Sequence, residues 1–462
     1  MVQDVTVVIL AAGLGTRMRS KHAKVLHEAG GRALVEHVVR TALEIAPPER
    51  VFVVVGHQAD RVRAKLAPYK VQFVEQREQK GTGHALSVCR EAIEPLGGLV
   101  VLLYGDGPLL EAGTVKKLVE KQTASTDAAT LITTVLETPR GYGRIVRDGE
   151  GRLLAIVEEK AATPEQLAIR EVNPGIYCFR SELLWRHIGE IKPDNPAQEY
   201  YLTDMPGILR RAGHSVGILE AEDARQLLAV NTRVELAEVD QVFRDRKRRE
   251  LMLSGVTIQN PETVVIDMDV QVGRDTVIEP FVRLLGRTVI GEDCRIGSAC
   301  VIEDSVLEDG AEVFPFSMVS GSYLEAKARV GPFARLRMES RVCEGAHVGN
   351  FVEMKKTRLG QHSKAMHLAY LGDSTIGAGA NIGAGTITCN FDGQKKHPTK
   401  IGDDAFVGSN TTLVAPVEVG AGSYVAAGSV ITEPVPPDSL GIARCRQTVK
   451  PEWAKRRREQ QR

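Results

Sequence analysis

Apolar residues recur at every sixth position over most of the second half of this chain. The step runs without a slip through residues 272–302, returns at 330–348, and resumes at 401–431. An amphipathic helix repeats near 3.6 residues and a single strand near 2, so neither explains a long series of sixes. A short strand with one inward aliphatic side chain, followed by a corner, does explain it. The spacing predicts a parallel β-helix, whose coils bury a continuous core only by stacking.

Three stretches interrupt the six-residue step, at 306–316, 359–371 and 390–400. At roughly eighteen residues per three-sided coil, the repeat predicts on the order of ten coils between Val256 and Ile431. Interruptions in a solenoid are expected to be insertions, and insertions often form the binding surface. We therefore expect the second and third interruptions to carry the chemistry of this half. An irregular all-β domain with chance spacing is the alternative.

Strand-like and helix-like patterns alternate in the first half of the chain. Short apolar runs are separated by segments whose apolar residues repeat at helical spacing. This alternation predicts a doubly wound, Rossmann-like α/β sheet that binds ligands at the carboxyl ends of its strands. The expected strands are 5–10, 51–55, 71–74, 99–104 and 129–136, and the expected helices surround 34–43 and 115–119.

A glycine-rich loop follows the first expected strand, where residues 10–18 read LAAGLGTRM. A buried strand that leads into such a loop places backbone N–H groups where phosphates can bind. The loop is not the dinucleotide fingerprint, because Met18 stands where a third glycine belongs. Arg17 and Lys24 could neutralise a triphosphate. A glycine loop taken by itself could equally be an ordinary turn.

The apolar strand at 99–104 leads to an acid, Asp106. A carboxylate in this position is suited to Mg²⁺, which needs oxygen ligands and usually keeps several waters and phosphate oxygens. Asp106 alone would be interpreted as a helix cap, but the Arg17 loop favours metal binding.

The loop at 75–85 also follows an expected strand. Glutamines such as Gln76 can read the edge of a base, and Gly81 with Thr82 opens a helix towards a ligand. His84 by itself is expected to be structural.

Composition gives no general attraction to nucleic acid or membranes. Lys plus Arg and Asp plus Glu each number 59, so the net charge is zero and any anion site must be local. The run from Val5 to Ala12 is too short to span a bilayer, and no other segment approaches that length.

The seven cysteines are scattered without Cys-x-x-Cys pairs, which favours a reduced cytoplasmic protein and argues against zinc. The polar, basic end at 451–462 is expected to be solvated and partly disordered.

A charged segment separates the two halves of the chain. Leu236, Val239 and Phe243 recur in it at helical spacing and predict one exposed linking helix. The basic run at its centre is flanked by acids and lacks aromatic partners, so nucleic-acid binding is not favoured. The expected divisions are a domain at 1–232, a linker helix at 233–253 and a domain at 254–462.

The glycine-rich string, together with Lys24, resembles the signature of sugar-nucleotide pyrophosphorylases, in which it binds a nucleoside triphosphate opposite a sugar 1-phosphate. The segments that resemble the uridylyltransferase members of that family are 141–145, 156–158, 171–175 and 229–233. The resemblance implies that Asp106 and Asn231 share Mg²⁺, and that Arg17 and Lys24 are catalytic. The residues that it places at the nucleotide and sugar are Leu10, Ala11, Ala12, Gly13, Lys24, Gln76, Gly81, Thr82, Tyr104, Gly105, Asp106, Gly143, Glu158, Asn173 and Asn231.

The second half resembles the C-terminal half of a single family, the bifunctional N-acetylglucosamine-1-phosphate uridyltransferases and glucosamine-1-phosphate acetyltransferases. The matching segments are 335–337, 347–356, 367–373, 381–386 and 388–393. With the N-terminal signature, the resemblance covers nearly the whole chain. It implies a pyrophosphorylase domain joined by a long helix to a left-handed parallel β-helix of hexapeptide repeats, which forms homotrimers.

Acyl transfer from a thioester to an ammonium-bearing sugar needs a base, and imidazole has an unperturbed pKa near working pH. His367 is expected in a non-periodic loop beside Tyr370 and is by resemblance that base; without the motif it would be interpreted as structural. Cys389 lies on a repeat strand without an obvious base, so no covalent acyl-enzyme is expected. By resemblance, the sugar phosphate contacts Arg337, Lys355, Tyr370, Asn381 and Lys396, and acetyl-CoA contacts Ala384, Asn390, Phe391, Ser409, Ala427 and Arg444.

Three positions depart from the family pattern. Gly107 replaces an apolar residue, Pro174 replaces a threonine, and Phe391 replaces a tyrosine. The first two put only the local fit in doubt, because neither is an expected ligand. Phe391 loses a hydroxyl and keeps the ring.

The resemblance implies two transfers in sequence. Acetyl-CoA acetylates glucosamine 1-phosphate, and the resulting N-acetylglucosamine 1-phosphate reacts with UTP to give UDP-N-acetylglucosamine for bacterial cell-wall synthesis. One alternative is a single-activity pyrophosphorylase with a structural β-helix, which predicts loss of the His367 loop and of Lys396. The other is a non-catalytic trimeric scaffold, which would tolerate replacement of Asp106 or His367.

Overall fold

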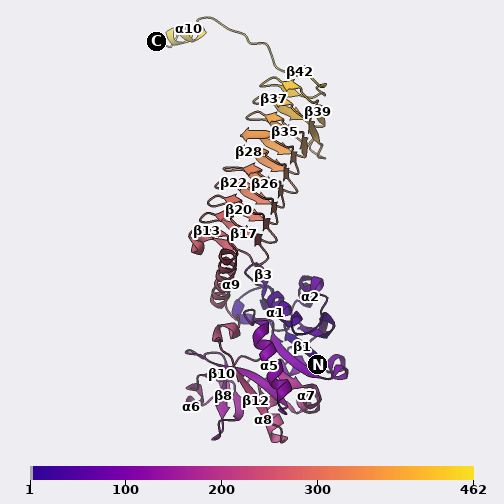
Figure 1. Cartoon of the computed structure of the whole chain (residues 1–462), viewed down its shortest axis with the longest axis vertical. Helices are drawn as coiled ribbons and strands as arrows, with labels where there is room; N and C mark the ends of the chain where they lie inside the picture. The colour runs from indigo at the N-terminus through magenta and orange to yellow at the C-terminus, as the bar shows by residue number, and fades with distance from the viewer. Residues whose placement is uncertain (1–3, 462) are drawn as a thin grey trace. The chain divides into compact units, whose positions relative to one another are not determined.

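The protein divides into two compact units in a computed structural model that describes residues 4–461 (Figure 1). The first unit ends at Phe243 and the second begins at Arg244. The expected linker is one helix over the expected range, α9 (Arg233–Leu253), and the division between the units falls inside it. Among the described residues, no helix has the length and apolar character needed to cross a membrane.

The first unit is built on a mixed sheet with strand order β5-β4-β1-β6-β11-β7-β10-β8-β9, and β12 pairs with β7. β1 lies between β4 and β6 and is parallel to both, as the apolar run at 5–10 predicts. The strands are β1 (Val5–Leu10), β4 (Val51–Val55), β5 (Gln72–Glu75), β6 (Leu99–Tyr104), β7 (Ala129–Val135), β8 (Gly143–Arg147), β9 (Leu153–Val157), β10 (Glu171–Asn173), β11 (Tyr177–Arg180) and β12 (Val216–Glu220). The α/β class is confirmed, but β11 runs antiparallel to both β6 and β7, so the sheet is not wholly parallel.

Helices cover this sheet and bury two apolar clusters against it. Every residue of β1 and β4 is buried, which explains their unbroken apolar sequences. The helices are α1 (Leu34–Leu43), α2 (Ala59–Leu66), α3 (Thr82–Ser87), α4 (Arg90–Ile93), α5 (Ala112–Ala124), α6 (Pro164–Leu167), α7 (Ser181–His187) and α8 (Met205–Arg211). The carboxyl ends of β1 and β6 lie side by side and carry the glycine-rich loop and Asp106.

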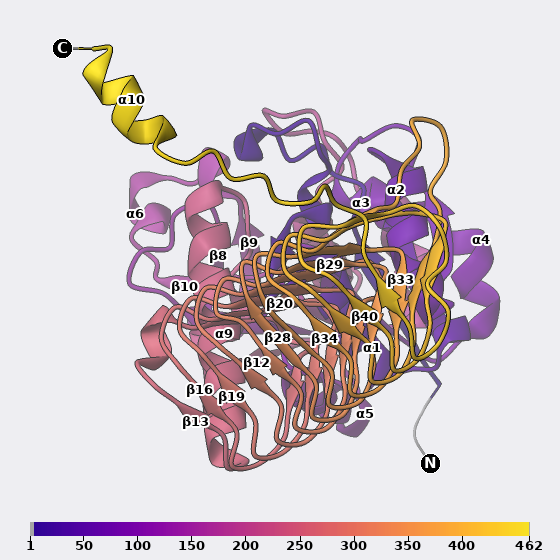
Figure 2. The ribbon, with the colours of Figure 1, turned by 90° about the horizontal axis from the view of Figure 1, so that it is seen from above.

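The second unit is a parallel β-helix whose coils stack one behind another (Figure 2). Its three sheets hold 11, 10 and 9 strands, in agreement with the expected ten or so coils. The stack runs from β13 (Thr257–Ile258) to β42 (Leu440–Gly441). The aliphatic residues at six-residue spacing, such as Ile296 and Leu336, form one continuous buried core. The hexapeptide interpretation is therefore confirmed.

Only the third interruption of the repeat is an insertion. Strand partners in a regular coil are 18 residues apart, as Val277 and Arg295 are. Across the first and second interruptions the separation falls to 17, as for Val289 with Val306 and Arg358 with Thr375. Across the third it rises to 25, between Ser374 and Thr399. The expectation of three insertions was wrong, because deleting one residue from a corner also shifts the phase of the repeat.

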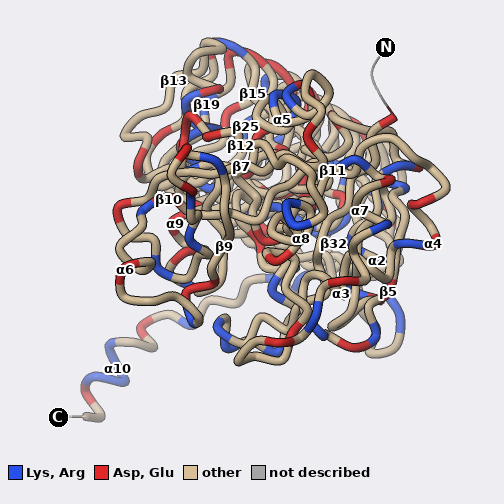
Figure 3. The backbone as a smooth tube through the Cα atoms, turned by 90° about the horizontal axis from the view of Figure 1, so that it is seen from below, with Lys and Arg blue, Asp and Glu red and all other residues tan. Residues whose placement is uncertain are grey.

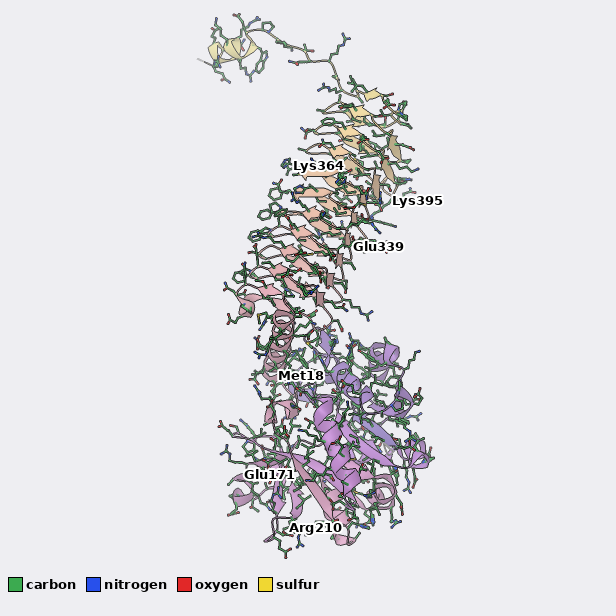
Figure 4. All side chains as sticks on the ribbon, viewed as in Figure 1. Met18, Glu171, Arg210, Glu339, Lys364 and Lys395 are labelled. Atoms are coloured by element: carbon green, nitrogen blue, oxygen red, sulfur yellow. The ribbon has the colours of Figure 1, made fainter. Side chains whose placement is uncertain are left out.

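The inserted loop follows β35 (Ile387–Cys389) and precedes β36 (Thr399–Ile401). It projects from the coils (Figure 2), and in Figure 4 its Lys395 lies on a different side of the stack from Lys364. Hydrogen bonds within the loop organise it: Asp392 accepts from the backbone N–H groups of Gln394 and Lys395 and lies 2.7 Å from the His397 ring.

The second half of α9 closes the first coil of the β-helix, so the expectation of an exposed linking helix was wrong for this half. Lys247 and Arg248 are buried. Arg248 donates to the carbonyl of Val264 at 2.8 Å, and Arg244 donates to the Asp267 carboxylate at 3.0 Å. The first strands of a parallel stack have no preceding coil to satisfy their backbone, so basic side chains that reach their carbonyls replace that pairing.

The basic end of the chain forms a helix, α10 (Trp453–Glu459), where the sequence indicated a partly disordered end. All its side chains are exposed, including three consecutive arginines at 456–458. Figure 3 shows Lys and Arg interspersed with Asp and Glu elsewhere in the chain.

Candidate active sites

The glycine-rich loop between β1 and the one-turn helix at 16–18 lines a cavity of about 470 Å³. Gly15 has a φ of +64°, and a Cβ there would lie 2.6 Å from the Cβ of Lys24. A side chain at this position would therefore displace the lysine that the sequence predicts to be catalytic. The predicted nucleotide residues that line this cavity are Leu10, Ala11, Ala12, Gly13, Lys24, Gln76, Gly81, Thr82, Tyr104 and Asp106.

A second cavity of about 280 Å³ adjoins the first, and Thr82, Tyr104 and Asp106 line both. The predicted residues that line this second cavity are Arg17, Thr82, Tyr104, Asp106, Gly143, Glu158, Asn173 and Asn231. Of the residues predicted for the first unit, only Gly105 lines neither cavity. The structure thus brings together residues that are more than 200 positions apart in the sequence.

Lys24 is the centre of a polar cluster between the two cavities. Its ammonium contacts the Asp106 carboxylate and donates to the side-chain oxygen of Asn231 at 3.1 Å. The same oxygen accepts from the Arg17 guanidinium at 2.9 Å. Two cations and two oxygen-bearing side chains therefore meet where the phosphates of a nucleotide in the glycine-rich loop would lie.

The pair Asp106 and Asn231 fits the requirements of Mg²⁺. Both side-chain oxygens converge on a single cation, the Lys24 ammonium, so both can face one ion. A carboxylate and an amide oxygen are hard ligands, and two protein ligands leave room for the waters and phosphate oxygens that Mg²⁺ retains. Within residues 4–461, no cluster of three or more His, Cys, Asp and Glu side chains forms a metal site by itself.

Glu158 is one of the carboxylates that line the second cavity. It accepts a hydrogen bond from the Thr203 hydroxyl at 3.0 Å. Burial raises the pKa of Glu158, and the charges of Asp204 and Glu199 act in the same direction while the Thr203 bond opposes them. Burial likewise raises the pKa of Tyr104, which stays a neutral hydroxyl. A largely desolvated carboxylate facing a cavity is suited to accept hydrogen bonds from sugar hydroxyls.

The segment 199–203 is a part of this site that the sequence analysis missed. Glu199 lines both cavities, and Thr203 binds Glu158. The segment packs on the Gly81 loop: a Cβ at Gly81, whose φ is +105°, would lie 2.6 Å from the carbonyl oxygen of Tyr200. No periodicity marks this irregular segment, so only the fold brings it to the site.

Gln76 organises the loop that the sequence analysis expected to read a base. Its amide nitrogen donates to the carbonyl of Gly81 at 3.2 Å and lies 3.0 Å from the Nδ1 atom of His84. Gln76 is buried. The loop is therefore held in place by its own side chains.

In the second unit, His367 is the last residue of strand β31 (Lys364–His367), not part of a non-periodic loop. The expectation of a loop was wrong because the second interruption is a shortened coil. The ring is exposed, and its Nδ1 atom lies 2.8 Å from the side-chain oxygen of Asn350 in β28 (His347–Asn350). Because an amide oxygen only accepts, this contact places the proton on Nδ1 and leaves Nε2 as the basic nitrogen.

A second group of predicted residues gathers at the ends of β29 (Glu353–Lys355) and β32 (Tyr370–Gly372). The buried Lys355 ammonium lies 2.9 Å from each carboxylate oxygen of Asp373. Asn390 donates to Asp373 at 2.5 Å and to the Tyr370 hydroxyl at 3.5 Å. Asp373 lay inside a segment quoted for the family resemblance, but it received no role there.

Arg337 and Lys396 complete the cationic part of this group. Arg337 pairs in register with Lys355 on the next coil and donates to Glu353 at 2.8 Å. Lys396 lies in the inserted loop and is near enough to Lys355 that the ammonium of Lys355 lowers the pKa of Lys396. Asn381 begins β34 (Asn381–Ile382) and pairs with Lys364.

Three predicted acetyl-CoA residues occupy the same corner of successive coils. The N–H of Asn410 bonds to the carbonyl of Ala384, and the N–H of Gly428 bonds to the carbonyl of Ser409, which aligns Ala384, Ser409 and Ala427 in one column. The pairing of Ala365 with Ile382 places His367 on the same column. Phe391 is exposed in the inserted loop, and Arg444 is exposed beyond β42; the structure brings neither into this column.

Comparisons with known proteins match both units. A family model described as "MobA-like NTP transferase domain" matches residues 7–199, and one described as "Bacterial transferase hexapeptide (six repeats)" matches 269–304 and 398–433. The "Bifunctional protein GlmU" of Solibacter usitatus is 57% identical over 459 residues, which cover 99% of this chain and 98% of that protein. The protein of the same name from Koribacter versatilis is 50% identical over 458 residues, 98% of this chain and 97% of its own.

This chain belongs to the bifunctional GlmU family. It is a bifunctional transferase that joins a nucleotidyltransferase unit to a hexapeptide acyltransferase unit. The Lys24 cluster lies in the first unit, and the His367 and Lys355 groups lie in the second.

Proposed function

We propose that this GlmU chain makes UDP-N-acetylglucosamine through two separate active sites, one in each unit. The observation that carries the proposal is the separation itself. The Lys24, Asp106 and Asn231 cluster lies in the first unit, and the His367 and Lys355 groups lie in the second. Each group has the chemical character that one of the two transfers requires.

Acetyl transfer takes place in the second unit. The Nε2 atom of His367 removes a proton from the ammonium of glucosamine 1-phosphate, and the freed nitrogen attacks the thioester carbonyl of acetyl-CoA. The carbon–sulfur bond breaks, and coenzyme A leaves as the thiol after taking up a proton. Arg337, Lys355 and Lys396 bind the sugar phosphate, with Tyr370 and Asn381 at the sugar. Acetyl-CoA lies along the Ala384, Ser409 and Ala427 column and contacts Asn390, Phe391 and Arg444.

Uridylyl transfer takes place in the first unit. A phosphate oxygen of N-acetylglucosamine 1-phosphate attacks the α-phosphorus of UTP, and the bond to the β-phosphate breaks to release pyrophosphate. The glycine-rich loop holds UTP, while Gly143, Glu158 and Asn173 hold the sugar. Arg17 and Lys24 offset the charge that develops on pyrophosphate. No protein nucleophile is required.

Asp106 and Asn231 would hold Mg²⁺ in the first unit. When bound, the ion would neutralise phosphate charge, which lowers the cost of placing the sugar phosphate beside UTP. Lys24 contacts both ligands, so this proposal requires its ammonium to turn towards the phosphates when the ion binds.

The acyltransferase unit is proposed to assemble as a homotrimer in the cytoplasm. Phe316, Phe333 and Phe351 occupy one corner of successive coils, stack with ring centroids 5.0 and 5.3 Å apart, and are about half exposed. An exposed aromatic ridge of this kind is suited to burial against another copy of the chain. Phe351 directly follows Asn350, so assembly on the ridge would bring a partner close to His367. The mass of wild type and of Phe333→Glu in solution tests this: the variant should be monomeric.

Two single substitutions test the separation of the sites. His367→Ala should abolish acetyl transfer and leave uridylyl transfer intact, and Asp106→Ala should do the reverse. Both half-reactions are measured on the same folded protein, with acetyl-CoA and glucosamine 1-phosphate for one and UTP and N-acetylglucosamine 1-phosphate for the other. Loss of both activities from either change would refute independent sites.

A further inference from the structure

Lys355 is a buried cation on an otherwise solvent-facing edge of the β-helix. Its residue is only 3% exposed, and its ammonium has both oxygens of Asp373 at 2.9 Å. A buried ammonium without a carboxylate partner loses its charge, because burial penalises the charged form. Whatever Lys355 does as a cation therefore depends on Asp373.

Asp373 is held in place by the coil geometry. It follows the last residue of β32, Gly372, which pairs in register with Lys355. Its backbone N–H bonds to the carbonyl of Lys355 at 2.9 Å, and its φ is +49°. Asp and Asn adopt this left-handed conformation more readily than most other residues with side chains. The carboxylate therefore has a defined position directly beside the ammonium.

Asp373 also orients Asn390, which begins the inserted loop. The Asn390 amide donates to Asp373 at 2.5 Å and reaches the Tyr370 hydroxyl at 3.5 Å. Gly372 makes this approach possible, because a Cβ there would lie 2.5 Å from the Asn390 nitrogen and 2.6 Å from the Tyr370 oxygen. One carboxylate thus contacts both a residue proposed for the sugar phosphate and one proposed for acetyl-CoA.

The charges around Asp373 are consistent with this arrangement. The hydrogen bond that Lys355 donates to Asp373 is the main cause that raises the pKa of Lys355, while the neighbouring Lys355 lowers the pKa of Lys396. Burial acts to raise the pKa of Asp373, but hydrogen bonds from Lys355 and Asn390 outweigh it and lower the pKa. The carboxylate stays ionised and keeps Lys355 charged next to a second cation.

We propose that Asp373 is a positioning residue of the acetyl-transfer site, which holds the Lys355 ammonium towards the phosphate of the amino sugar and the Asn390 amide towards the acyl donor. The inference rests on the proposed roles of Lys355 and Asn390. It assigns to Asp373 no contact with substrate. It predicts that removing only the negative charge weakens binding of both substrates and makes binding of the sugar phosphate dependent on pH.

The test uses Asp373→Asn in the full-length chain, with Asp304→Asn as the matched control. Asp304 lies at the same corner of an earlier coil and also has a positive φ, +44°, but its carboxylate accepts from the backbone N–H of Arg287. KM and kcat for acetyl transfer are measured from about pH 7 to pH 9. Relative to wild type, Asp373→Asn should raise KM for glucosamine 1-phosphate on the order of tenfold near pH 9 and less near pH 7. The reason is that Lys355, buried without its carboxylate partner, loses its proton more easily. KM for acetyl-CoA should rise about threefold or more. Asp304→Asn should leave both unchanged.

Unchanged KM values, or a rise in KM that is the same at every pH, would overturn the inference. So would a loss of kcat that only follows a lower melting temperature, because that marks a purely structural ion pair. If Asp373→Asn does not fold, Asp373→Gly removes the carboxylate and adopts a φ of +49° without strain. Asp373→Glu keeps the negative charge. The ratio of its KM for glucosamine 1-phosphate to that of wild type should therefore be the same at every pH.

Lys355→Ala distinguishes failure of the proposed role of Lys355 from failure of the proposed role of Asp373. If Lys355→Ala leaves KM for glucosamine 1-phosphate unchanged, the proposed role of Lys355 fails and the inference fails with it. If Lys355→Ala raises that KM and Asp373→Asn does not, only the inference fails. Uridylyl transfer measured on every variant should stay at the wild-type rate, because its residues lie in the other unit.

Discussion

The Nδ1 atom of His367 lies 2.8 Å from the side-chain oxygen of Asn350, its partner in register on the preceding coil. The stacking of coils, not the local sequence, produces this contact, since the two residues are 17 positions apart. It sets which ring nitrogen carries the proton and holds the ring at one orientation. In the proposed reaction, Asn350 is therefore the residue that makes His367 a usable base.

Asn350→Ala should lower kcat for acetyl transfer about ten- to a hundredfold, because partners that orient a functional imidazole typically contribute at that level. KM for the two substrates should change little. Asn350→Asp keeps an acceptor at the same position and should retain most of the activity. Equal losses in the two variants would show that the contact does not act through the histidine.

From the burial of Glu158 we predict a pH dependence of uridylyl transfer. Because burial raises its pKa, the carboxylate becomes protonated at a higher pH than an exposed glutamate. If it accepts hydrogen bonds from the sugar, KM for N-acetylglucosamine 1-phosphate should increase as the pH falls, and this increase should begin at a higher pH than the protonation of an exposed glutamate would give. Glu158→Gln should raise that KM about tenfold, typical of a lost bond to a charged group, and remove this pH dependence. A wild-type KM with the same pH dependence as the KM of Glu158→Gln would contradict the assignment.

The elements with a strong period were predictable from the sequence. α9 has the bounds of the charged segment between the two halves, in which three apolar residues at helical spacing indicated a helix. β1 has the bounds that its apolar run predicted, because a buried strand repeats the same contact along its whole length. The β-helix was predictable for the same reason. β11 was not, because Tyr177–Arg180 is short and its antiparallel pairing depends on strands distant in sequence.

In the candidate sites, too, some residues were predictable from the sequence and others were not. Residues inside recognisable motifs, such as Lys24 and His367, could be named in advance. Thr203 and Asn350 could not be given roles, because they become neighbours of Glu158 and His367 only when the sheet and coils form. A break in a six-residue period does not distinguish a shortened corner from an inserted loop, so the position of His367 was also wrong.

We predict that Arg248 stabilises the first coil of the β-helix. It is buried and donates to the carbonyl of Val264 at 2.8 Å. Arg248→Met fills similar space but leaves the carbonyl without this donor, and should cost about 1–3 kcal/mol of stability. Urea denaturation of the full chain, followed by acetyl-transfer activity, measures the effect. The exposed neighbour Arg249→Met is the control and should leave the midpoint unchanged.

His37 predicts acid sensitivity of the first unit. The ring is buried, stacks on Phe243 with centroids 4.0 Å apart, and has its Nε2 atom 2.8 Å from the carbonyl oxygen of Ala29. Burial is the main cause that lowers its pKa to about 4; nearby Arg32 and Arg40 act in the same direction, and Glu36 and the Ala29 carbonyl oppose them.

A histidine whose pKa is lower in the folded state contributes stability above its unfolded pKa, near 6.5, and that contribution is lost as the pH falls towards 4. The loss amounts to about 3 kcal/mol at most. Calorimetry of the full chain should therefore show the transition of the first unit falling steeply across this window. In His37→Gln, which cannot titrate and keeps a donor for Ala29, that part of the fall should be absent, whereas His57→Gln should behave like wild type. An identical pH dependence in the His37→Gln variant and wild type would show that acid destabilises the unit through other groups.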